Sequence, residues 1–329
     1  DIFEFYEDYL GLPYPHENFK LAFLEELPGT LVVGATVAFC SDALLHDACV
    51  ADQVQPAACE LALAVATQWF GAFIDVPTWS EVWTLEGLAR LLRHEFVRAA
   101  FGIAAAKLAL YSSMQVVRVV EGGNALAGVV MPPLSHPTFE SHPAALMEDF
   151  GAVNALPVVA GLSLVSHALS YGSVFGVKAF VVMHMLQTRA GPEKFKRLLV
   201  GTCRRALDSD LATILDFEGE IFARLCKKDS SLREFAEMWV SRAGSPTLLC
   251  GFWFNRKQHM AEVAIRQEGV RDWNSDKFTG PLILRIHEYD GLYDHVLHID
   301  DVYNVCSAPV NSKNRKARAK TVKLENGEY

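Results

Sequence analysis

The chain has 329 residues, enough for about two domains of ordinary size and a large buried core. Apolar residues make up 51% of it and charged residues 21%, which excludes a disordered chain and a coiled coil. Lys and Arg number 30 against 39 Asp and Glu, so a net charge of −9 excludes a protein that binds phosphates over its whole surface. Any contact with nucleic acid must then come from a local basic segment.

The seven cysteines are odd in number and none has Cys-x-x-Cys spacing, so we expect reduced thiols in an intracellular compartment. The chain opens with Asp1-Ile2-Phe3-Glu4, without an initiator Met or a signal-peptide pattern, and we interpret it as a piece of a longer protein. Residues 150–177 contain no Asp, Glu, Lys or Arg. Their Asn, Ser, His and Pro residues favour a buried helix over a membrane span.

The first third of the chain predicts helices that flank a short β-rich segment. Residues 1–10 have helical spacing, and residues 20–27 and 31–39 are rich in β-forming side chains. Residues 56–101 are predicted to be helical, with Pro56 in the first turn, where a missing N–H is tolerated.

The remainder predicts further helices and then strands. Residues 102–145 show little periodicity and contain an expected loop at 131–143, whereas residues 144–240 return to helical spacing with a turn at 190–192. After Gly244-Ser245-Pro246 the pattern alternates, with Phe252 and Phe254, then Ala261, Val263 and Ile265, then Leu282, Leu284 and Ile286. Tyr289-Asp290-Gly291-Leu292 is typical of a hairpin turn. We therefore predict an α+β chain: a mostly helical domain over 1–243 and an all-β sandwich over 244–329.

The most informative motif is Gln68-Trp69-Phe70-Gly71, followed by a Trp-rich helix with Trp79, Trp83 and the pair Glu86-Gly87. It resembles the zinc aminopeptidases of the gluzincin clan, in which HExxH precedes QWFG and a Glu on the next helix is the third zinc ligand. This resemblance implies a thermolysin-like helical domain. It also implies where the catalytic groups of the family fall in this sequence.

The family's zinc-binding histidines fall on Leu63 and Thr67, its general base falls on Ala64, and only the third ligand position, Glu86, keeps a carboxylate. Leucine cannot bind zinc and alanine cannot accept a proton from water, so we expect no metal, no cofactor and no catalysis. Glu86 is then more simply read as a carboxylate held by an arginine or by backbone amides. Trp69, Trp79 and Trp83 are more simply read as core aromatics than as a peptide groove.

Two further family positions are occupied by apolar residues. The loop that grips the free amino group of a peptide aligns with residues 29–33, where the family's Glu is replaced by Val32. The family's transition-state tyrosine aligns with Phe175, although another register reaches Tyr171. The histidines have no ligand spacing, which disfavours a cryptic metal site.

Other segments narrow the resemblance. Tyr14-Pro15-His16-Glu17-Asn18, the QWFG helix without histidines, Phe254-Asn255-Arg256-Lys257 and the basic run after residue 311 together resemble the TFIID subunit 2 family, whose body is aminopeptidase-like. The resemblance implies a nuclear, non-catalytic structural subunit that assists core-promoter recognition and assembly of the RNA polymerase II pre-initiation complex. Its implied partners are other TFIID subunits, including the TATA-binding protein and histone-fold associated factors, and core-promoter DNA, with no membrane.

The basic run is the one place where local charge favours nucleic acid or a partner protein. Its six cations are Lys313, Arg315, Lys316, Arg318, Lys320 and Lys323. A solvated linker or a nuclear-import patch fits the same composition. Two alternatives remain open for the whole chain: a peptide- or partner-binding pseudo-peptidase outside TFIID, and a zinc aminopeptidase with unusual ligands.

Overall fold

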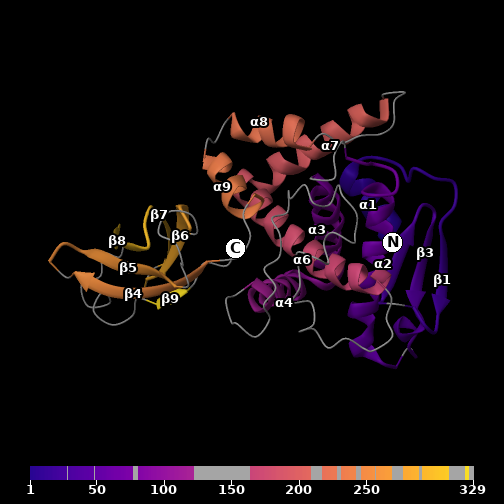
Figure 1. Ribbon diagram of the computed structural model, residues 1–329, viewed down its shortest axis with the longest axis horizontal. Coiled ribbons are helices and arrows are strands. Elements are labelled where there is room, and N and C mark those ends of the chain that lie inside the picture. The colour runs from indigo at the N-terminus through magenta and orange to yellow at the C-terminus, as the bar shows by residue number, and fades with distance from the viewer. Residues whose placement is uncertain are drawn as a thin grey trace. The chain divides into compact units, whose positions relative to one another are not determined.

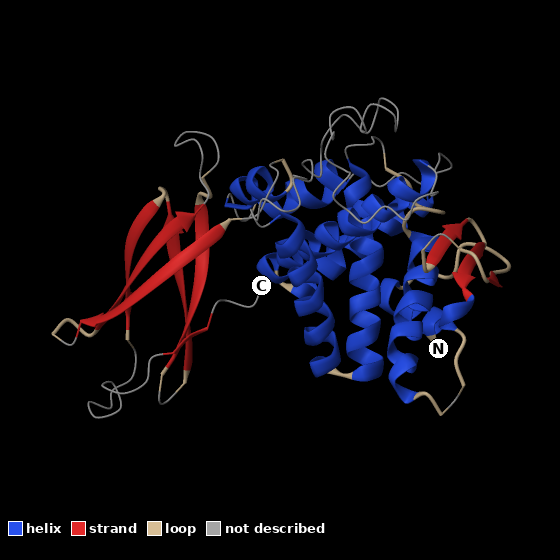
Figure 2. Ribbon diagram, turned by 60° about the horizontal axis from the view of Figure 1, so that its bottom comes forward, coloured by secondary structure: helices blue, strands red, loops and turns tan. Residues whose placement is uncertain are grey.

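The structure is a computed structural model of residues 1–329. It describes residues 1–27, 29–47, 49–76, 81–121, 164–208, 217–227, 231–241, 246–255, 257–268, 277–288, 291–310 and 323–325. Contacts group the chain into two units, Asp1–Lys228 with Val240–Ala243, and Asp229–Trp239 with Gly244–Tyr329. The first unit is mostly helical and the second mostly β, so the predicted α+β class is confirmed (Figures 1 and 2). The division predicted at residues 243 and 244 stays a prediction.

The first unit is built from helices that pack around α3. Its helical elements are α1(Ile2–Leu10), α2(Ala51–Trp69), α3(Val82–Phe101), α4(Ile103–Glu121), α6(Leu164–Ala190), α7(Pro192–Asp208), the π-helical η5(Phe217–Phe222) and α8(Ala223–Cys226). Helix α3 packs against α2, α4 and α6 (Figure 1). Its buried Leu88, Leu91 and Leu92 lie in the same apolar interior as Phe180 and Met183 of α6. This interior fixes the two helices, α2 and α3, that carry the aminopeptidase-like motif.

A small sheet flanks these helices, formed by β1(Lys20–Leu24), β2(Leu31–Gly34) and β3(Val37–Ser41) in the order β1-β3-β2. Strands β1 and β3 are parallel, whereas β2 and β3 form an antiparallel hairpin in which Gly34 faces Val37. The β-rich run 31–39 is therefore two strands. Thr36 turns the chain between them with a positive φ of 62°. The 3-10 turn η1(Asp42–Leu44) follows.

Three boundaries differ from the sequence predictions. Helix α2 begins at Ala51 and not at Pro56, so Pro56 lies inside the helix. At the start of the helix, the Gln53 N–H donates to the Val50 carbonyl at 3.3 Å. Residues 103–121, predicted without periodicity, form α4, because alanine-rich sequence has high helix propensity. The first strand ends at Leu24 instead of residue 27. The expected loop at 131–143 lies outside the described residues.

Half of the stretch considered as a membrane span, residues 150–163, also lies outside the described residues, and the other half begins α6. Of the helices in the described parts of the chain, none combines the length and the apolar content that a bilayer crossing requires.

The second unit is a sandwich of two three-stranded sheets accompanied by α9(Ser231–Trp239) (Figure 2). One sheet has the order β4-β5-β8 and the other β7-β6-β9. The strands are β4(Thr247–Asn255), β5(Met260–Glu268), β6(Gly280–His287), β7(Leu292–Ile299), β8(Tyr303–Pro309) and β9(Lys323–Glu325). The predicted hairpin is confirmed, since β6 and β7 pair antiparallel with His287 facing Leu292.

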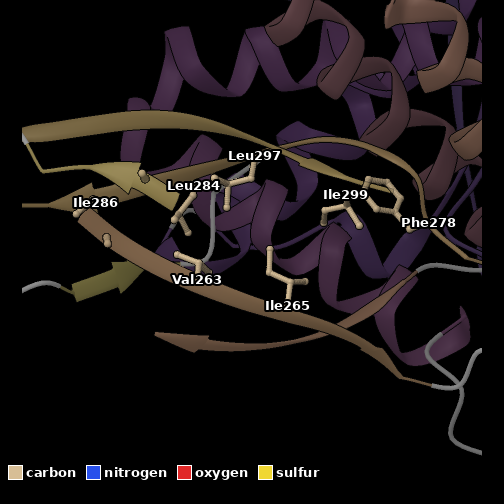
Figure 3. Packing of buried hydrophobic residues seen from close by; sticks show 9 residues of the cluster. Val263, Ile265, Phe278, Leu284, Ile286, Leu297 and Ile299 are labelled. Carbon is tan, nitrogen blue, oxygen red and sulfur yellow. The ribbon is translucent and has the colours of Figure 1, made fainter. Parts of the chain in front are cut away.

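The alternation in the sequence forms the sandwich core. Val263 and Ile265 of β5 face Leu284 and Ile286 of β6 and Leu297 and Ile299 of β7, with Phe278 at one end (Figure 3). Phe278 also contacts Trp239 of α9, with ring centroids 5.9 Å apart. Phe252 of β4 does not follow the prediction: it is 38% exposed, because β4 lies at the edge of its sheet.

Candidate functional site

The motif Gln68-Trp69-Phe70-Gly71 ends helix α2 and turns the chain. Trp69 and Phe70 are buried, each 1% exposed. Gly71 has a backbone φ of +119°, a value that residues other than glycine rarely adopt. The turn is closed by the Gly71 N–H, which donates to the Ile74 carbonyl, and by the Ile74 N–H, which donates to the Trp69 carbonyl, both at 2.9 Å. Three of the four motif residues therefore have a folding role.

Gln68 joins the end of α2 to the β2–β3 hairpin. It is fully buried, its Oε1 accepts the Thr36 N–H at 2.8 Å, and its Nε2 donates to the Gly34 carbonyl at 3.0 Å. These two bonds hold the hairpin turn, which contains the positive φ of Thr36. Because Val32 lies in β2, Gln68 also fixes the strand in which the resemblance places the amine-binding position.

The tryptophans of the motif are core residues, as expected for Trp69 and Trp83. Trp69 lies within an aromatic cluster, with ring centroids 5.5 Å from Tyr14, 5.9 Å from Tyr6 and 6.2 Å from Phe3. Trp83 is 3% exposed and packs on Phe217 with centroids 5.9 Å apart. Trp79 lies outside the described residues. The two described rings fill the interior and do not line an open groove.

The positions of the family's HExxH motif lie on one stretch of α2. Leu63 is 8% exposed and Ala64 is fully buried. The Thr67 hydroxyl donates to the Leu63 carbonyl at 2.9 Å, a bond to its own helix one turn back. No side chain at these three positions offers a basic nitrogen or a carboxylate.

Glu86, at the position of the third ligand, is paired with an arginine. Its carboxylate forms an ion pair with the Arg90 guanidinium one turn later in α3, and the Arg90 side chain is 12% exposed. Gly176 of α6 leaves the space that the guanidinium fills, since a Cβ there would lie 2.6 Å from Arg90 Nη2. Arg93, on the same helix, pairs with Glu60 of α2 at 3.9 Å. Proximity to Arg90 contributes to a lowered pKa of Arg93, although burial is the larger cause.

These residues do not fit a zinc ion. A tetrahedral zinc site needs three or four nitrogen, sulfur or carboxylate donors. Here one position is a hydrocarbon, a second is a hydroxyl bound to its own helix, and the third is a carboxylate already neutralised by a guanidinium. In the described parts of the chain, no three His, Cys, Asp or Glu side chains are grouped so as to hold a metal ion. The residues at these three positions therefore cannot hold a metal ion that would activate water.

The two remaining family positions are also apolar. Val32 is half-buried in β2 and pairs with Phe39 of β3. Phe175 is 6% exposed on α6, directly before Gly176. The side chain of Tyr171, the alternative in another register, lies outside the described residues. Neither described side chain supplies a charge or a hydroxyl.

One pair of titratable groups has no signal in the sequence. His94 of α3 and His184 of α6 are far apart in the chain, yet their ring centroids are 5.2 Å apart. Burial, with smaller contributions from His184, Arg98 and Arg93, lowers the pKa of His94 to about 4, and burial together with Arg98 lowers the pKa of His184. Next to them, Gln187 donates to Glu95 at 3.1 Å. Both imidazoles are therefore neutral near pH 7, and they join α3 to α6.

The predicted basic segment is mostly outside the described residues. Lys313, Arg315, Lys316, Arg318 and Lys320 are not described. Lys323 begins β9, where its backbone pairs with His287 of β6. Its side chain is likewise not described.

The fold and the degenerate site together define an aminopeptidase-like helical domain joined to an immunoglobulin-like β-sandwich. Residues 1–127 match the Peptidase family M1 domain, and residues 243–329 match the TAF2 Ig-like domain. The expected thermolysin-like domain followed by a β-sandwich is therefore confirmed.

The chain is a homologue, over its whole length, of a segment of transcription initiation factor TFIID subunit 2, as the sequence resemblance predicted. It is 30% identical to the Drosophila melanogaster protein of that name, covering 100% of this chain and 28% of the relative. The Danio rerio protein is 26% identical, with 100% and 27% covered. Human endoplasmic reticulum aminopeptidase 1 is 31% identical over only 29% of this chain and 10% of its own length. The chain thus spans little more than a quarter of the TFIID subunit 2 proteins it matches.

Proposed function

We propose that this chain is a non-catalytic structural part of a subunit of the general transcription factor TFIID, acting in the nucleus. The observation that carries the proposal is the similarity to TFIID subunit 2 along 100% of the chain, whereas the similarity to an aminopeptidase covers 29% of it. In this role the chain contributes to core-promoter recognition and to assembly of the RNA polymerase II pre-initiation complex. Its partners are other TFIID subunits, including the TATA-binding protein and histone-fold associated factors.

The proposal includes the loss of the zinc aminopeptidase machinery. Leu63, Ala64 and Thr67 replace the two histidines and the general base, and the one remaining carboxylate, Glu86, pairs with Arg90. A hydrolase of this kind needs a metal to activate water and a base to accept its proton. Leu63 and Ala64 supply neither at the family's positions, and we infer a pseudoenzyme whose domain is retained for its shape.

The same motif explains why the domain persists without chemistry. Gln68, Trp69, Phe70 and Gly71 hold the hairpin, fill the core and turn the chain. Each of these tasks is independent of a metal. Selection for folding alone is therefore sufficient to keep the motif.

Promoter DNA is proposed to meet the basic segment, because the rest of the chain is acidic. Neutralising six phosphates gives a slope of about −5 in log affinity against log salt. Replacing Lys313, Arg315, Lys316, Arg318, Lys320 and Lys323 by Gln should flatten the salt dependence of promoter-fragment binding by about that amount. An unchanged slope would show that DNA is held elsewhere.

Affinity purification of the full-length protein from nuclear extract, after nuclease treatment, tests the assignment to TFIID. We expect the TATA-binding protein and histone-fold factors in stoichiometric amounts. A matched purification tests the aminopeptidase alternative by assaying fluorogenic aminoacyl substrates with and without chelator. Absence of those partners, or hydrolysis that the chelator abolishes, would contradict the proposal.

A further inference from the structure

Strand β4 is an edge strand among the described strands, and its own sequence lacks the residues that usually protect such an edge. In the order β4-β5-β8, among the described strands, β4 pairs with β5 alone. Its nine residues, Thr-Leu-Leu-Cys-Gly-Phe-Trp-Phe-Asn, include no charged residue and no proline. Edge strands of stable proteins are normally guarded by lysine, proline or a bulge, since unpaired N–H and C=O groups invite another strand. An unguarded edge of this length indicates a place where a strand is added.

The outer face of β4 carries two exposed apolar side chains. Ala261, Val263 and Ile265 of β5 point into the core, so the residues that alternate with them point outward, and so do their partners on β4. Those partners are Leu249 opposite Arg266, Gly251 opposite Ala264, and Trp253 opposite Glu262. Leu249 is 44% exposed and Trp253 is 69% exposed. Because Gly251 has no side chain, the outer face of β4 has a depression between Leu249 and Trp253.

The size of the edge favours an extended segment over a second copy of the chain. Nine strand residues measure about 30 Å. Two rigid edges that pair along that length cover a strip about 10 Å wide, or about 300 Å² on each copy, well under the about 800 Å² per partner of stable interfaces. A flexible segment pairs on the same edge and also folds its own side chains onto Leu249 and Trp253 on one face and onto Phe252, 38% exposed, on the other.

Charge defines the chemistry of that segment. Glu262 lies opposite Trp253 on the same face of the sheet, and the Asn255 amide donates to its Oε1 at 3.1 Å. A cation over the exposed indole face gains both the ring quadrupole and this carboxylate. An acidic residue at the same place is repelled by Glu262.

We propose that β4 is a docking edge for an extended segment of a partner protein. The segment adds as a fourth strand to the β4-β5-β8 sheet, with an apolar residue against Leu249 and an Arg or Lys over Trp253. The edge and its charges belong to the β-sandwich alone, so the inference goes beyond the proposed function and does not depend on it.

The probes are dye-labelled, capped nine-residue peptides that alternate Val at odd and Thr at even positions and carry Arg, Gln or Glu at the third position, which faces Trp253 when the peptide adds antiparallel to β4. Fluorescence anisotropy with the whole chain should give saturable binding of the Arg peptide, at least tenfold weaker binding of the Glu peptide, and an intermediate value for Gln. Hydrogen exchange of residues 247–255 should slow when the Arg peptide is bound, because their unpaired N–H groups become hydrogen-bonded.

Variants separate the edge from the rest of the sheet. Trp253→Ser should weaken the Arg peptide at least tenfold, whereas Tyr303→Ser, a 61% exposed residue on the same face of the opposite edge strand, should leave it unchanged. Both side chains are exposed, so both variants should melt with the parent. Lack of saturable binding, equal affinity for the Arg and Glu peptides, or exchange protection outside β4 would overturn the proposal. Concentration-dependent dimers lost in Leu249→Lys would assign the edge to a second copy and also overturn it.

Discussion

Replacing Gly87 by Ala should destabilise the helical unit, although alanine is the better helix former. A Cβ on Gly87 of α3 would lie 2.9 Å from the Ala179 carbonyl oxygen and 3.2 Å from the Met183 Cβ, both on α6. The first of these is backbone, so it cannot move away as a flexible side chain could. Overpacking of this kind costs about 3 kcal/mol, at the upper end of its range, and the helix propensity of alanine returns about 1 kcal/mol. We expect a net loss of about 2 kcal/mol.

Gly201→Ala is the matched control. Gly201 lies within α7, and the nearest atom to an added Cβ is Nη1 of Arg205 at 3.8 Å, an ordinary contact. Only the propensity term applies there, so this variant should gain up to about 1 kcal/mol. Urea unfolding followed by circular dichroism at 222 nm gives both values. A Gly87→Ala variant as stable as the parent, or as Gly201→Ala, would refute the close approach of α3 and α6.

Two further variants test side-chain contacts that hold the elements of the helical unit together. Gln68→Leu removes the hydrogen bonds to the Thr36 N–H and the Gly34 carbonyl, which leucine cannot replace, so urea unfolding should show a loss of about 2–3 kcal/mol; a loss below about 0.5 kcal/mol would mean that the hairpin is held by other contacts. His94 has a pKa of about 4 when folded and about 6.5 when unfolded, so stability should fall as the pH falls from 6.5 to 4, by about 3 kcal/mol in all. His94→Phe should remove most of that acid sensitivity, and an unchanged pH profile would contradict the buried position of the imidazole.

Elements with strong local patterns were predictable from the sequence. The strict alternation of Ala261, Val263 and Ile265 and the Asp-Gly turn before Leu292 specify β5 and the β6–β7 hairpin without help from the rest of the chain. Helix α4 was missed because apolar residues such as Ile103 and Leu108, 66% and 64% exposed, lie outside its buried side and obscure the helical period.

The same distinction holds for the candidate site. The QWFG motif and the apolar residues at the family's catalytic positions could be predicted from the sequence, because their spacing along α2 and α3 is local. The partners of these residues were not, because they come from distant segments: Gln68 holds the hairpin at Thr36, and Arg90 fills the space left by Gly176. The His94–His184 pair is of the same kind, since only the packing of α3 on α6 brings the two rings together. Sequence spacing carries no information on such contacts.

The central claim is that the aminopeptidase-like domain has lost its zinc site. The most direct test is to dialyse the purified chain first with zinc and then without it, and to measure the retained zinc by mass spectrometry. A variant with Leu63→His, Ala64→Glu, Thr67→His and Arg90→Met is the positive control, because it restores the donors and removes the guanidinium beside Glu86. We predict less than about 0.1 zinc per chain for the parent and about one for this variant. One tightly bound zinc per parent chain would contradict the claim that the aminopeptidase-like domain has lost its metal site.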